Sequence, residues 1–145
     1  VNTRGPFFLT QAFAKRLLAM PAAAAGVHRS ITFITSANAE MASLNRGEYC
    51  VSKAGLSMVS HLFALRLAEH GVGVYQVRPG VIATDMTAPA KQPYDKAIAE
   101  GLSPIRRWGQ PEDVAAAVAT LAQGLLPFTV GEAIHVDGGL HVPRL

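Results

Sequence analysis

The chain has 145 residues, of which 50% are hydrophobic and 16% charged; this composition excludes a disordered segment and suits one domain with its own core. The net charge is only +3 and the basic residues are scattered, which argues against nucleic-acid binding. The single cysteine, Cys50, excludes an internal disulfide, and the lack of a signal pattern or a long apolar run predicts a cytoplasmic chain without a membrane span.

Helical and strand patterns alternate along the first half of the chain. Apolar residues over 7–20 recur at helical spacing, with basic residues on the opposite side. The β-branched run 30–36 is typical of a buried strand, and 37–47 is expected to be loop. A second helix is predicted from Tyr49 to about Glu69, where a His-Gly pair ends it.

The second half continues the alternation. Residues 71–80 predict a second strand that a Pro-Gly pair ends, and 85–108 is expected to be loop with short helical pieces. Residues 110–124 predict a helix with proline and two acidic residues in its first turn, and 131–139 predict a third strand running into a glycine turn. This order predicts an α/β fold with a parallel sheet, built by residues 1–145 as one domain or as part of one.

Polar residues follow two of the predicted strands. Ser36 ends the first strand, Tyr49 heads the next helix, and Lys53 lies one turn further on. Pro79 and Gly80 end the second strand. Because carboxyl ends of parallel strands meet at one edge, we expect these residues to converge there.

The chemistry of such a group is specific. A free tyrosine has a pKa near ~10, and a neighbouring ammonium favours its phenolate. A serine hydroxyl beside the phenol can hold a carbonyl oxygen while a proton moves. Hydride transfer would need a cofactor, because no side chain carries a hydride.

Four segments together carry a resemblance to a known family: Ser36-x12-Tyr49-x3-Lys53, RPGVIATDM, RRWGQPEDVAAAV and GEAIHVDGG. From Asn2 to Gly139 the chain resembles the C-terminal half of a short-chain dehydrogenase/reductase, and is most similar to β-ketoacyl-carrier-protein reductases. Tyr-x-x-x-Lys alone is a weak motif, whereas this order and spacing make it specific.

The resemblance implies a role for each catalytic candidate. Tyr49 matches the general acid/base, and Lys53 the residue that lowers the tyrosine's pKa and binds the nicotinamide ribose. Ser36 matches the serine that orients the substrate oxygen. Asn2 matches an asparagine that holds a water in a proton relay, although it also fits a plain helix-start asparagine.

The resemblance also implies a cofactor-binding segment. Pro79, Gly80, Ile82 and Thr84 match residues beside the nicotinamide, and Met86–Pro104 matches a mobile substrate lid. The implied cofactor is NADP(H) or NAD(H), with NADP(H) slightly favoured. The helix with the tyrosine matches one used in dimer packing, so a homo-oligomer, dimer or tetramer, is expected.

One part of the family pattern has no counterpart here. The strand, T-G-x-x-x-G-x-G turn and helix that hold the cofactor's pyrophosphate are absent, so the fold expected is a partial, doubly wound Rossmann sheet that lacks its N-terminal dinucleotide-binding βαβ half. The resemblance implies that about the first hundred residues of an ordinary family domain are missing. The strand over 30–36 would then have an open apolar edge.

The expected function is an oxidoreductase that transfers a hydride between NAD(P)(H) and a carbonyl or secondary alcohol, such as a 3-oxoacyl compound. Two alternatives stay open: a catalytically inactive fragment, or a cofactor-free packing or oligomerisation module on the same scaffold. Singly, Tyr49 could cap a helix and Lys53 could be a solvated charge. The five histidines have no metal-ligand spacing, so no metal site is expected.

Overall fold

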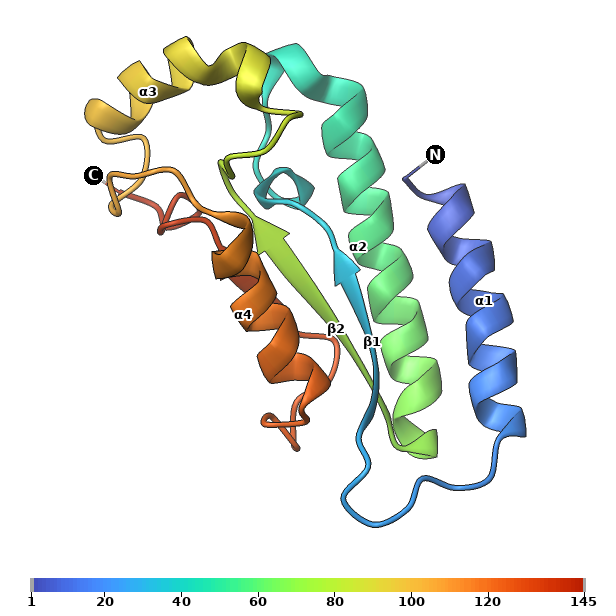
Figure 1. The fold of residues 1–145 in the computed structure, drawn as a ribbon. Helices are drawn as coiled ribbons and strands as arrows, with labels where there is room; N and C mark the ends of the chain where they lie inside the picture. The colour runs from blue at the N-terminus through green and yellow to red at the C-terminus, as the bar shows by residue number, and fades with distance from the viewer. Residues whose placement is uncertain (1, 145) are drawn as a thin grey trace.

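The computed structural model describes residues 2–144. Three parallel strands form its sheet: β1 (Arg29–Ile34), β2 (Val72–Pro79) and β3 (Ala133–Val136), in the order β1-β2-β3 (Figure 1). The predicted parallel α/β sheet is therefore confirmed. Within the described residues β1 pairs with β2 alone, so it is an edge strand, and Ile34 at its end is 45% exposed.

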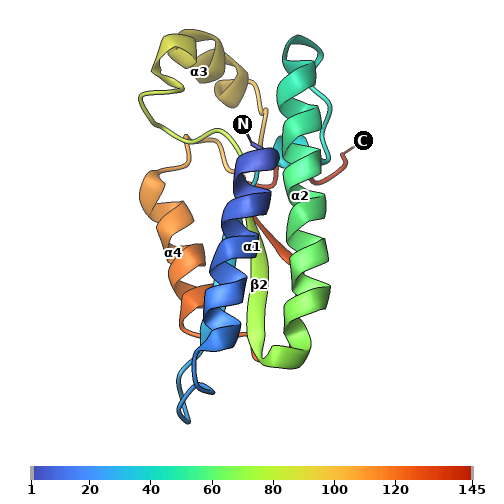
Figure 2. The same ribbon diagram turned by 90° about the vertical axis from the view of Figure 1, so that its right-hand side faces the viewer.

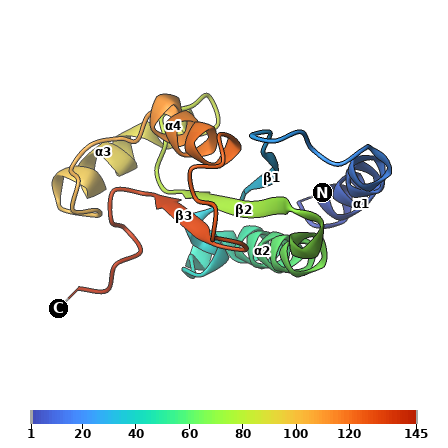
Figure 3. The ribbon, with the colours of Figure 1, turned by 90° about the horizontal axis from the view of Figure 1, so that it is seen from below.

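Helices cover both faces of the sheet. α2 (Gly47–Leu67) packs on one face and α4 (Pro111–Ala122) on the other, as the view along the sheet shows (Figure 3). α1 (Arg4–Ala19) lies alongside α2 (Figure 2). This arrangement is the doubly wound half-sheet expected from the sequence. No helix within residues 2–144 is long and apolar enough to cross a bilayer.

The central strand β2 supplies the core to both layers. Val72 and Val74 point to one face and join the apolar cluster of α1 and α2. Tyr75 and Val77 point to the other face and pack against Leu121 of α4. The alternation follows from the two-residue period of a strand, and it fixes which face each side chain of β2 serves.

Segments predicted as loop contain short helices. The segment after β1 forms two 3₁₀ turns, η1 (Ala37–Ala39) and η2 (Leu44–Arg46). Further along, η4 (Ala88–Ala90) leads into α3 (Lys91–Ala99), a nine-residue α-helix where only short helical pieces were expected. Pro93 lies in the first turn of α3, where its missing N–H removes no helical hydrogen bond.

Candidate active site

The carboxyl ends of the strands and the starts of two helices meet at one edge of the sheet. α1 and α2 run antiparallel to the strands, so their N-termini lie on the side where β1 and β2 end (Figure 1). Ser36 follows β1 by two residues, Gly80 follows β2 directly, and Tyr49 lies in the first turn of α2. The topology thus brings together residues that are far apart in the sequence.

A cavity of about 540 Å³ opens at this edge, and four of the predicted residues line it: Ser36, Tyr49, Pro79 and Gly80. The rest of its wall comes from the η1–η2 segment, the region around α3 and the C-terminal segment. Those further lining residues are Ala37, Asn38, Met41, Ala42, Ser43, Arg46, Val81, Met86, Thr87, Ala90, Tyr94, Leu102 and Leu140. The segment expected to act as a substrate lid therefore borders the same space as the serine and the tyrosine.

The hydroxyl of Ser36 is oriented by the turn that follows it. Ser36 is the N-cap of η1, and its Oγ accepts a hydrogen bond from the backbone N–H of Asn38 at 3.1 Å. Because the oxygen already accepts, the hydroxyl proton remains available to donate. A side chain that lines the cavity and can donate a hydrogen bond is suited to hold a carbonyl oxygen.

Lys53 lies one turn beyond Tyr49, as its spacing predicts. Its Nζ is 5.6 Å from the centre of the Tyr49 ring and donates a hydrogen bond to the carbonyl of Ile34 at 3.2 Å. That carbonyl belongs to the end of the edge strand β1. Partial burial lowers the pKa of the Lys53 ammonium. Lys53 does not line the cavity itself, but its ammonium lies beside Tyr49, which does.

Asn2 is connected to the first turns of α2 through a residue that was not predicted. Its Nδ2 donates to Ser52 Oγ at 3.1 Å, and the Ser52 hydroxyl donates to the carbonyl of Tyr49 at 2.8 Å. The start of α1 approaches α2 closely here, since a Cβ on Gly55 would lie 3.1 Å from Thr3 Oγ1. Asn2 thus lies at the end of α2 that carries Tyr49, and its hydrogen bond goes to Ser52.

The Pro-Gly turn after β2 needs glycine for packing. The N–H of Gly80 donates to the carbonyl of Val136 at 3.0 Å. A Cβ on Gly80 would lie 2.7 Å from Cβ of Asp137 and 2.8 Å from its Cα. Any side chain at this position would push β2 and the segment after β3 apart and would deform the wall of the cavity.

Ile82 and Thr84 lie beyond the cavity wall. The Ile82 side chain is buried and lines a neighbouring cavity, and its backbone forms a parallel bridge with Gly109. The N–H of Thr84 donates to Thr87 Oγ1 at 3.0 Å, and the Thr84 hydroxyl is 3.3 Å from the same oxygen. Of the four residues predicted after β2, Pro79 and Gly80 line the main cavity, whereas Thr84 lines a separate hollow next to Trp108.

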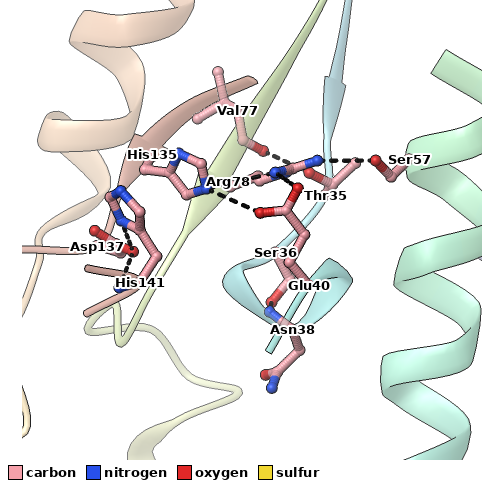
Figure 4. Close-up of polar contacts among 10 residues, drawn as sticks. All are labelled: Thr35, Ser36, Asn38, Glu40, Ser57, Val77, Arg78, His135, Asp137 and His141. Carbon is pink, nitrogen blue, oxygen red and sulfur yellow. Dashed lines mark hydrogen bonds and ion pairs between the residues drawn. The ribbon is translucent and has the colours of Figure 1, made fainter. Parts of the chain in front are cut away.

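A buried arginine that the sequence analysis did not single out fixes the serine turn. Arg78 of β2 forms an ion pair with Glu40 and donates to Ser57 Oγ of α2 at 3.0 Å (Figure 4). Glu40 is the C-cap of η1, the turn that begins with Ser36. The hydrogen bond from Arg78 is the main cause that lowers the pKa of the Glu40 carboxyl. These contacts link the serine turn to β2 and α2.

Two histidines extend this polar cluster towards β3. The rings of His135 and His141 stack with their centres 3.8 Å apart, and His141 Nδ1 is 2.8 Å from Asp137 Oδ2 (Figure 4). His135 Nε2 lies 3.7 Å from Glu40 Oε2. Burial, and then the charges of His141 and Arg78, lower the pKa of His135. Within residues 2–144 no three His, Cys, Asp or Glu side chains are grouped so that they could hold a metal ion.

Comparison with known proteins identifies the family. Residues 1–141 match the family model described as enoyl-(acyl carrier protein) reductase. The chain belongs to this family of short-chain dehydrogenase/reductases. A (3R)-3-hydroxyacyl-CoA dehydrogenase of Canis lupus familiaris is 36% identical over 143 residues, which are 98% of this chain and 52% of that protein. A 3-oxoacyl-[acyl-carrier-protein] reductase of Rickettsia felis is 39% identical over 66% of this chain and 39% of its own length.

Solved structures agree with this assignment. A 3-oxoacyl-[acyl-carrier protein] reductase from Brucella melitensis in complex with NAD is 50% identical with a TM-score of 0.94, and the match covers 100% of this chain and 56% of that one. A putative 2-deoxy-D-gluconate 3-dehydrogenase from Agrobacterium tumefaciens with bound NADP is 33% identical with a TM-score of 0.86, covering 99% of this chain and 56% of that one. The chain spans about half the length of the (3R)-3-hydroxyacyl-CoA dehydrogenases that it matches, 52% for the canine enzyme.

Proposed function

We propose that this chain is the catalytic, C-terminal part of an NAD(P)(H)-dependent oxidoreductase that transfers a hydride between the nicotinamide and a carbonyl or secondary alcohol. The observation that carries the proposal is the single cavity lined by Ser36, Tyr49, Pro79 and Gly80, with the Lys53 ammonium 5.6 Å from the tyrosine ring. A proton donor, an oxygen-holding hydroxyl and a cation next to the donor are what carbonyl reduction requires.

Each side chain has a separate task in this proposal. Tyr49 gives a proton to the carbonyl oxygen during reduction, while the Ser36 hydroxyl, held by the Asn38 N–H, donates a hydrogen bond to that oxygen. The Lys53 ammonium stabilises the phenolate that remains. Asn2, bonded to Ser52 at the start of α2, belongs to the path that returns a proton to the site.

The chemistry of the donors fits a nicotinamide dinucleotide, which would supply the hydride. The Lys53 ammonium is a donor suited to ribose hydroxyls, and the Thr84 hydroxyl and the backbone after Gly80 are suited to a carboxamide. A cavity of about 540 Å³ lies within the range of ordinary ligand sites. The related structures with NAD and with NADP support a dinucleotide of either kind, and the sequence resemblance slightly favours NADP(H).

The names of the relatives favour a 3-oxoacyl compound or a similar ketone as the substrate. They include a (3R)-3-hydroxyacyl-CoA dehydrogenase and 3-oxoacyl-[acyl-carrier-protein] reductases. The lining of the cavity is compatible with such a chain, because Met41, Met86, Leu102 and Leu140 give it apolar walls next to the polar groups of Ser36 and Tyr49.

A binding experiment tests the proposal. The 145-residue chain and the same chain joined to its natural upstream sequence are titrated with NADPH and NADH by calorimetry, and reduction of a 3-oxoacyl thioester is followed by loss of NAD(P)H absorbance. We expect saturable binding and turnover for the longer protein. If the longer protein shows no binding and no turnover, the proposed function is contradicted.

A second candidate is a packing or oligomerisation module, which the exposed apolar side chains of α1 and α2 favour. Leu9 of α1 is 72% exposed, and Val51 and Leu65 of α2 are 74% and 78% exposed. Apolar faces of this kind suit association with a second copy, so we also propose a homo-oligomer, either dimer or tetramer. Sedimentation of the longer protein tests this: assembly without cofactor binding favours the module, and a monomer contradicts the proposed oligomer.

A further inference from the structure

The wall of the active-site cavity contains a single charged side chain. Among its seventeen lining residues only Arg46 carries a charge, and the others are apolar, hydroxyl-bearing or amide side chains. Acidic residues next to lining positions in the sequence, such as Glu40, Glu48 and Asp85, do not line the cavity. A substrate in this cavity therefore meets one formal positive charge and no formal negative charge on the wall.

Arg46 has no anionic partner among the residues that the structure describes. Within residues 2–144 it forms neither a salt bridge nor a side-chain hydrogen bond, whereas Arg78 is paired with Glu40 and Arg107 with Asp113. Its guanidinium carbon lies 5.7 Å from the centre of the ring of Tyr94 in α3. An aromatic face at that distance attracts the cation and restricts its position, while all five N–H donors stay available.

The position of Arg46 relative to the tyrosine limits the kind of anion. Arg46 directly precedes α2, and Tyr49 follows three residues later on the first turn. Arg46 is the N-cap of α2, and its side chain lines the same cavity of about 540 Å³ as that of Tyr49. A carboxylate held by Arg46 and a carbonyl held by Tyr49 can thus belong to one small molecule, in which a few carbon atoms separate the two groups.

We propose that Arg46 determines substrate specificity by binding the carboxylate of a short oxo acid, and that Tyr94 holds the guanidinium in place. The planar fork of an arginine matches a carboxylate with two parallel hydrogen bonds. This inference rests on the proposed function and adds a substrate class to it: ionised oxo acids are preferred over neutral ketones of the same size.

The test compares 3-oxobutanoate with its methyl ester in the longer protein, because the two differ in charge and share the ketone. In Arg46→Gln we expect kcat/KM for 3-oxobutanoate to fall roughly 10-fold relative to the ester. The loss should be in KM rather than kcat, since the carboxylate is charged in both ground and transition state. Arg46→Lys should keep part of the preference, and Arg66→Gln at the exposed far end of α2 should keep all of it.

A binding measurement decides the inference even if the proposed reaction fails. Trp108, the only tryptophan, packs edge-on against Tyr94 with ring centres 5.6 Å apart, so its fluorescence reports on the ring that holds Arg46. Titration with 3-oxobutanoate should give a saturable change in the parent protein that Arg46→Gln loses. An unchanged titration in Arg46→Gln, or an unchanged ratio of acid to ester turnover, overturns the inference and leaves Arg46 a solvated surface arginine.

Discussion

The two faces of the central strand β2 serve different purposes. The face towards α4 is apolar, and Tyr75 and Val77 are almost completely buried there against Leu121. The face towards α2 begins apolar at Val72 and Val74, but its last side chains are the buried Gln76 and Arg78. Burying polar side chains is unfavourable unless they are paired, and Arg78 has Glu40 and Ser57 as partners.

The difference between the faces explains how the site is built. Apolar packing on the α4 side stabilises the sheet but does not orient any group in the cavity. The polar end of the α2 side ties the turn that begins at Ser36 to the neighbouring strand and helix. We therefore expect substitutions on the α4 side to lower stability alone, and substitutions at the polar end to lower activity more than their effect on stability explains.

The largest effect is expected at Tyr49, which shares the cavity with Ser36. Tyr49→Phe removes the proton donor and keeps the ring, so kcat should fall about 10³-fold, within the usual range for general acid–base groups. The melting temperature and the affinity for NADPH should stay close to those of the parent protein. Single-turnover kinetics in the longer protein measure the loss, and turnover at the parental rate would remove Tyr49 from the mechanism.

The second effect tests the apolar face. Leu121 is 1% exposed, and Leu121→Ala should lower the free energy of unfolding by about 3 kcal/mol, since the cavity left behind adds to the lost burial. Urea unfolding measures the loss. The kcat of the folded fraction should not change, because no side chain of the cavity contacts Leu121 in its cluster. A fall in kcat as large as that of a polar-end variant would break the distinction between the two faces.

The elements of the fold were largely predictable because their patterns are local. The strand predicted over 30–36 is β1 at Arg29–Ile34, and the helix predicted from Tyr49 to about Glu69 is α2 at Gly47–Leu67. Apolar residues at fixed periods mark such elements whatever the rest of the chain does. α3 was less clear, because it is short and has Pro93 in its first turn.

The candidate site was predictable only in part. Ser36 and Tyr49 stand at element ends, where topology alone brings them together, and the structure places both on one cavity. Arg46 and the Arg78–Glu40 pair could not be predicted in the same way. Ion pairs between distant segments leave no periodic pattern, and an arginine in a loop looks the same whether it faces a cavity or open solvent.

The third effect tests the polar end directly. Arg78→Met keeps much of the buried volume but leaves Glu40 and Ser57 without their partner, so we expect a loss of about 2 kcal/mol in stability. We also expect a fall in kcat at saturating substrate, because the turn that orients Ser36 loses its anchor. Comparison with Leu121→Ala separates the two explanations: the leucine variant should be the less stable protein and the more active one.

The smallest effect is a dependence of stability on pH that originates in the same cluster. The pKa of His135 is lowered from 6.5 by burial and by the charges of His141 and Arg78, against the opposite influence of Asp137 and Glu40. The unfolded chain therefore takes up a proton at a higher pH than the folded one, and stability falls as the pH drops through about 6.5. Glu40 affects stability at lower pH. Because its pKa is lowered in the folded state, its contribution to stability is present above pH 4.5 and is lost as the pH falls further.

His135→Gln isolates the contribution of His135 to the dependence of stability on pH. The urea midpoint of the parent protein should decrease between pH 7.5 and 5.5, and His135→Gln should reduce that decrease, since the titrating group is gone while the ring's neighbours remain. His70→Gln, at the opposite end of α2 from the site, is the matched control and should retain the parental decrease. If both variants depend on pH as the parent does, the titration of His135 is not coupled to folding, and the polar end of β2 contributes geometry to the site without making the fold sensitive to acid.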